Sequence, residues 1–111
     1  MRLETSAQSV IDATGGAAVS TPSPRVGTSW LVEQIIVRLE ASGLASLCTT
    51  YKNTAVPSNM ISPTRTGNSD TDSIPNVTLY PGETVIAVWT GGTVGVIATV
   101  SLRGQVVLDG F

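Results

Sequence analysis

Two apolar segments near the end of the chain constrain its fold most strongly. Residues 83–90 and 94–103 are rich in β-branched residues, which favour extended backbone. In the second segment apolar side chains recur at every other position, so one face is apolar and the other polar. The Pro81–Gly82 step before the first segment favours a type II turn, because glycine accepts positive φ there. We expect a turn and then a β-hairpin, with turn glycines at 91, 92 and 95.

The composition favours an all-β protein. The chain has 111 residues, which suits one domain, and only 13% of them are charged. That charged share is about half of what globular proteins usually carry. Serine and threonine make up roughly a quarter of the residues, and they suit half-exposed strands and turns better than helix faces.

The charge pattern argues against nucleic acid as a partner. The net charge is −2, and the six basic residues are scattered along the chain. A nucleic-acid-binding protein needs a clustered basic surface that releases counterions.

No run reaches the roughly 18 consecutive apolar residues of a membrane span, and the first 12 residues lack the apolar centre of a signal peptide. We expect no membrane partner.

Catalytic and metal-binding residue patterns are weak. The chain has no histidine to activate its single cysteine, Cys48, which we expect to be a small buried hydrophobic residue. Residues 68–73 resemble the start of a calcium loop, but Ser73 and Leu79 stand where that loop needs glycine and glutamate. A turn capped by side-chain hydrogen bonds explains the run as well. We expect a protein that is not an enzyme and holds no metal or cofactor.

The central part of the chain contains one ambiguous segment and one long polar segment. Residues 29–43 fit an amphipathic helix about as well as a strand covered on both faces. Residues 44–52 and 76–80 read as strands. Between them, residues 53–75 are polar and contain three prolines, and a loop of that length is usually functional or held by a partner.

We expect a β-sandwich or jelly-roll domain at residues 29–103, between two terminal segments. Residues 1–28 read as an extended N-terminal arm with short edge strands near 8–13 and 17–21, and residues 104–111 read as an apolar C-terminal tail. Neither segment has an evident core of its own, so both are candidates for partner binding. The candidate contact residues are Val106, Val107, Leu108 and Phe111 in the tail and Val19 and Arg25 in the arm.

Several short motifs rich in glycine and aromatic residues follow one another along the chain. They are GGAAV at 15–19, WLVEQIIV at 30–37, GNSD at 67–70, YPGE at 80–83, WTGG at 89–92 and GVIAT at 95–99. This order resembles small virion structural proteins of tailed bacteriophages, notably of phages that infect actinobacteria. The resemblance covers most of residues 15–103, and it favours a strand at 29–43. Its motifs are structural rather than catalytic.

The resemblance implies a capsid decoration or accessory protein. Its expected partners are the major capsid protein or other virion proteins and further copies of itself, as a homo-oligomer, within virions assembled in the bacterial cytoplasm. An alternative is a receptor- or carbohydrate-binding module at the phage neck or tail, which would use Trp30 or Trp89 and residues 53–75. We expect the tryptophans to anchor the core instead, because each lies within an apolar strand.

Overall fold

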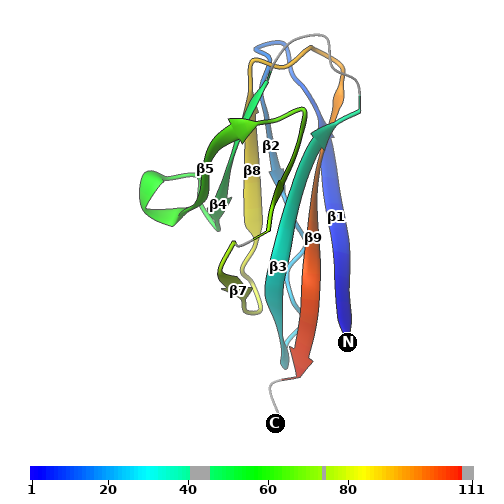
Figure 1. Ribbon diagram of the computed structural model, residues 1–111, viewed down its shortest axis with the longest axis vertical. Coiled ribbons are helices and arrows are strands. Elements are labelled where there is room, and N and C mark those ends of the chain that lie inside the picture. Colours follow the sequence, from blue (N-terminus) through cyan, green and yellow to red (C-terminus); the bar gives the residue numbers. More distant parts are fainter. Residues whose placement is uncertain (41–45, 74, 109–111) are drawn as a thin grey trace.

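The computed structural model describes residues 1–40, 46–73 and 75–108. Two antiparallel sheets pack face to face, and Figure 1 shows their strands running along the long axis of the molecule. The predicted all-β sandwich is therefore confirmed. No helix among the described residues is long and apolar enough to cross a membrane.

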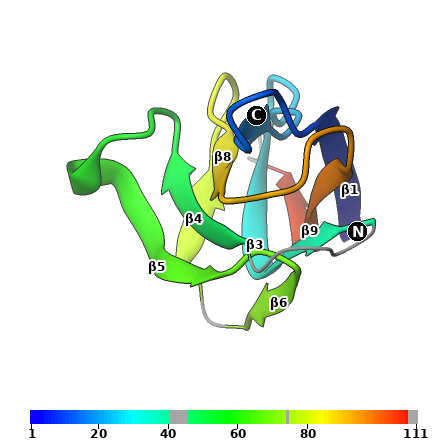
Figure 2. The same ribbon diagram turned by 90° about the horizontal axis from the view of Figure 1, so that it is seen from above.

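Each sheet draws its strands from both halves of the chain. The five-stranded sheet has the order β1, β9, β3, and β6 and β7 both pair with the far edge of β3. The four-stranded sheet has the order β2, β8, β4, β5, and Figure 2 shows the two layers from one end. The strands of the first sheet are Arg2–Val10 (β1), Ile97–Leu108 (β9), Thr28–Leu39 (β3), Ser69–Asp72 (β6) and Val77–Leu79 (β7). Those of the second are Ala17–Ser20 (β2), Val85–Thr90 (β8), Leu47–Lys52 (β4) and Met60–Thr66 (β5), with a short 3-10 helix at Pro57–Asn59.

The core lies between the sheets and follows the two-residue period of the strands. Val85, Ala87 and Trp89 point inward from β8, and Val100 and Leu102 point inward from β9. All five side chains are fully buried. The expectation that Trp89 anchors the core is confirmed.

The ambiguous segment at 29–43 is a strand over its described part, β3. A β-bulge falls between Val32 and Gln34, so Glu33 has no residue opposite it on β9. The bulge shifts the inward positions, so Val32 lies inward before it and Ile35 and Val37 lie inward after it. This shift explains why the apolar residues do not alternate strictly in the sequence.

The expected C-terminal hairpin is wrong. The strands β8 and β9 belong to different sheets, and residues 91–96 carry the chain from one sheet to the other. The amide of Gly92 donates to the carbonyl of Gly15 (2.8 Å), and that of Gly95 donates to the carbonyl of Ile11 (3.0 Å). The connection from β8 to β9 is thus hydrogen-bonded to the connection from β1 to β2, which also passes from one sheet to the other.

The terminal segments also differ from expectation. In the proposed arm at 1–28, the short edge strand expected at 17–21 is β2, which pairs with β8, whereas the strand expected at 8–13 is instead β1, which begins at Arg2 and pairs with β9 over nine residues. The described part of the proposed tail at 104–111 continues β9, which pairs there with both β1 and β3. Both segments contribute apolar side chains to the sandwich: Leu3 and Ile11 of the first lie in the core, and Val106 of the second packs against it. The polar segment 53–75 likewise contains two strands, β5 and β6.

Candidate partner-binding surface

The end of β9 divides the predicted tail residues between the core and the surface. Val106 packs against the core, and its amide donates to the carbonyl of Met1 (2.8 Å). Val107 and Leu108 are 42% and 72% exposed. Phe111 lies outside the described residues. Val107 and Leu108 are therefore the predicted tail contacts that lie exposed on the surface.

The two predicted arm residues lie in different environments. Val19 is 4% exposed in the core, so its side chain is not available to a partner, and that prediction is corrected. Arg25 is exposed in the turn before β3, where its carbonyl accepts hydrogen bonds from the amide (3.0 Å) and hydroxyl (2.7 Å) of Thr28. Thr28 lies opposite Leu108 in the sheet, which places the turn at Arg25 beside the end of β9.

Further exposed apolar side chains lie at this end of the sandwich. Val26, in the same turn as Arg25, is 92% exposed. Tyr80 follows Leu79, which pairs with Trp30 on the neighbouring strand, and Met1 is held beside Val106. We call this set the apolar end: Met1, Val26, Tyr80, Val107 and Leu108. Met1, Val26 and Tyr80 are not among the contact residues predicted from the sequence, because isolated apolar residues outside strands follow no periodic pattern.

The apolar end can contribute to binding because its side chains stand on ordered strands and turns. Full burial of a valine or leucine side chain contributes about 1.5 to 3 kcal/mol before the costs of association. Strand pairing has already fixed the backbone at Val107 and Leu108, so a partner has less conformational entropy to remove. Arg25 adds a positive charge at the margin of the set.

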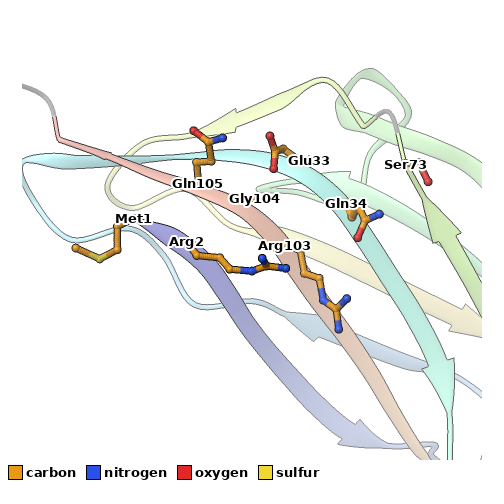
Figure 3. A pocket seen from close by; sticks show the side chains of 8 residues that line it. All are labelled: Met1, Arg2, Glu33, Gln34, Ser73, Arg103, Gly104 and Gln105. Atoms are coloured by element: carbon orange, nitrogen blue, oxygen red, sulfur yellow. The ribbon is translucent and has the colours of Figure 1, made fainter.

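A polar hollow lies on the outer face of the five-stranded sheet, next to the apolar end. Its volume is about 770 Å³, and Figure 3 shows side chains entering it from three adjacent strands. It is lined by Met1, Arg2, Glu33, Gln34, Ser73, Arg103, Gly104 and Gln105. Arg2 also pairs with Glu4 at 3.1 Å. Guanidinium, carboxylate and amide groups together suit hydrogen bonding to a polar protein surface.

The bulge and one glycine shape this hollow. Glu33 is the extra residue of β3, and Gly104 lies opposite Val32 beside it. A Cβ atom on Gly104 would lie 1.9 Å from the carbonyl oxygen of Leu31. The close approach of the two strands therefore requires glycine at 104.

The acidic run that resembles a calcium loop forms β6 instead. Asp70 and Asp72 lie opposite Val37 and Ile35, so their side chains face the gap between the sheets and are half-buried. The hydroxyl of Ser62 donates to Asp72, and the amide of Thr71 donates to Asp70 at 2.8 Å. Among the described residues no group of three or more His, Cys, Asp or Glu side chains is placed to hold a metal.

Cys48 lies at the other side of that gap and is buried. Burial raises the pKa of its thiol to about 12. A thiol with so high a pKa carries little thiolate at neutral pH, so it is a poor nucleophile.

The two tryptophans lie on opposite sheets. Trp89 is 0% exposed, and its indole N–H donates to the carbonyl oxygen of Gly67 at 2.9 Å. Trp30 is partly buried and packs against the core. Trp89 therefore has no ring face to offer a sugar.

Comparison with known proteins adds no relative: neither a family model nor a curated protein matches the chain.

Proposed function

We propose that the chain is a non-enzymatic structural protein of a bacteriophage virion, a capsid decoration or accessory protein that binds the major capsid protein or other virion proteins. The observation that carries the proposal is the apolar end, where Val107 and Leu108 stand exposed on a strand whose inward side chains, Ala98, Val100 and Leu102, belong to the core. Such side chains gain free energy when another protein covers them. The order of motifs, which resembles that of small virion structural proteins, supports the same role.

The arrangement of polar groups supports an interaction role over catalysis. The hollow beside the apolar end brings together guanidinium, carboxylate and amide side chains, which bind a partner through hydrogen bonds. The chain has no histidine, and its one cysteine is buried with a raised pKa. These features fit a surface that contacts another protein.

The carbohydrate-binding alternative has less support. It requires an aromatic ring face beside a polar groove, and Trp89 is enclosed in the core. Tyr80 is exposed, but it stands at the start of the turn that leads to Glu83 and does not line the polar hollow.

The first test is whether the chain is part of the particle. Particles of a phage whose genome encodes the chain would be purified by density gradient and analysed by mass spectrometry. Immunogold labelling would then locate the chain on the particle. The proposal expects the chain in the particle fraction and label over the capsid. Absence from purified particles would contradict the virion role, and label confined to the tail would favour the receptor-binding alternative.

A further inference from the structure

The strand β1 forms a long free edge of the five-stranded sheet. It runs for nine residues, Arg2–Val10, and pairs with β9 at nine consecutive positions without a bulge. Among the described residues no strand pairs with its other side, and Figure 1 shows β1 as the outermost strand of that sheet. A row of backbone groups along β1 is therefore open to another strand.

The hydrogen bonds at the two ends of β1 show which backbone groups are open. The amide of Val106 donates to the carbonyl of Met1 (2.8 Å), and the amide of Ile11 donates to the carbonyl of Val96 (2.9 Å). Both positions on the β1 side are odd-numbered. Because an antiparallel ladder alternates, the odd-numbered residues of β1 bond to β9, and the even-numbered ones direct N–H and C=O to the free edge.

The other edge strands are short or carry features that discourage pairing; β2 has four residues and β7 has three. The edge strand β5 contains Pro63, and its register with β4 shifts twice. The edge strand β6 has four residues, and Asp70 and Asp72 point inward from it. Prolines, irregular registers, short strands and inward acidic residues all protect sheet edges. The sequence of β1 has no proline or lysine, and its last five residues are uncharged.

We propose that β1 pairs with β1 of a second copy, antiparallel, about a two-fold axis at Ser6. This register overlaps all nine residues and joins the two five-stranded sheets into one. It places Arg2 opposite Val10 of the second copy, Glu4 opposite Gln8, and Ser6 opposite Ser6. Even-numbered residues thus face even-numbered residues, as the open backbone groups require.

The charges of β1 favour a second copy in this register. Arg2 and Glu4 form an ion pair on the outer face, and neither lies opposite a like charge when the axis passes through Ser6. An axis at Glu4 would instead set two carboxylates opposite each other, which is unfavourable. Val10, which is 54% exposed, lies opposite the aliphatic part of Arg2 and becomes partly covered.

This inference rests on the interaction role proposed above, but its test needs no virion. Sedimentation velocity of the purified full chain over a dilution series should show a monomer–dimer equilibrium. The variant Ser6→Pro removes an open N–H without touching the bonds to β9, so it should keep the β-sheet circular dichroism spectrum and raise the dimer dissociation constant at least about tenfold. A wild-type chain that stays monomeric, or a variant that associates as well as wild type, overturns the proposal.

Disulfide trapping tests the register independently of any folding defect in that variant. Directly opposite residues lie about 5.5 Å apart, within the range that a disulfide spans. The variant Ser6→Cys should therefore cross-link into dimers under mild oxidation. The matched control Gln8→Cys should not, because its two copies would stand about 13 Å apart along the strands. Equal cross-linking of both variants would overturn the two-fold axis at Ser6. Failure of either experiment leaves the detection of the chain in particles unaffected, so the two proposals fail separately.

Discussion

Gly104 and Leu31 approach so closely that a Cβ atom on the glycine would lie 1.9 Å from the leucine carbonyl oxygen. Gly104 lies opposite Val32, next to the bulged residue Glu33. The contact is between backbones, so no side-chain rotation relieves it. Glycine at this position allows the two strands to approach beside the bulge, where Gly104 also lines the polar hollow.

The variant Gly104→Ala should therefore destabilise the fold by about 3 kcal/mol, because β9 and β3 must separate to admit the methyl group. Urea denaturation followed by circular dichroism measures the change. Gly95→Asn is the control, since nothing lies within 4 Å of a Cβ there; its φ of 88° strains any side chain, so this variant measures a backbone cost without a steric clash. A smaller loss for Gly104→Ala than for Gly95→Asn would contradict this reading of the bulge.

The hydrogen bond from Trp89 to Gly67 predicts a second loss of stability. Trp89→Phe leaves the Gly67 carbonyl without its indole donor and creates a small void, which together should cost about 2 to 3 kcal/mol. Trp30→Phe, at a partly buried position, should cost less. Chemical denaturation of both variants decides the order, and a larger effect at Trp30 would show that the core is centred elsewhere.

Cys48 predicts a loss of stability at alkaline pH. The pKa of its buried thiol is raised from 9.0 in the unfolded chain to about 12 in the fold. The contribution of the protonated thiol to the free energy of unfolding is therefore fully present below pH 9 and is lost as pH rises from there towards 12. The free energy of unfolding should fall more steeply above pH 9 in wild type than in Cys48→Ala. Parallel curves for the two proteins would contradict the burial of the thiol.

The lowered pKa of Asp12 predicts that the fold loses stability as the pH falls into the acid range. Hydrogen bonds from the hydroxyl of Thr14 (2.6 Å) and the amides of Gly16 (3.2 Å) and Thr14 (2.9 Å) lower the pKa of this carboxyl. A lowered pKa stabilises the fold above the unfolded value, and that contribution disappears as pH falls through the folded value. Asp12→Ala should be less stable than wild type at pH 7 and match it in strong acid. A gap that persists in strong acid would mean that the side chain acts through packing rather than charge.

Part of the fold follows from local pattern, and part does not. The inward positions of β9 are predicted by alternation, and Gly82, with a φ of 87°, takes the turn position expected of it. In β8 residues 85–89 are all apolar, so alternation does not predict which of its side chains point inward. The pairing of β8 and β9 is not predictable in the same way, because a glycine-rich connection serves a hairpin and a crossing between sheets equally well. Residues 1–28 look too polar for a core, but each strand there buries only a few apolar residues, such as Leu3 in β1 and Val19 in β2.

The predicted partner-binding residues are also only partly predictable from local sequence pattern. The apolar run at 106–108 predicts a contact surface, but strand pairing assigns Val106 to the core and leaves Val107 and Leu108 outside. Val26 joins them only because Thr28 pairs with Leu108. The spacing of residues in the sequence does not predict the long-range pairing of Thr28 with Leu108.

The most direct test of the central claim is the retention of the double variant Val107→Ser/Leu108→Ser on purified particles. Removing residues 104–111 would not separate attachment from folding, because β9 pairs with β1 and β3 through that region. The two exposed side chains can be changed with little effect on the core, and Val94→Ser supplies an exposed control in the loop between β8 and β9. We predict that the double variant melts close to wild type and loses at least about tenfold in particle binding, while Val94→Ser binds normally. A double variant that binds particles as well as wild type would contradict the claim that the apolar end attaches the protein to the virion.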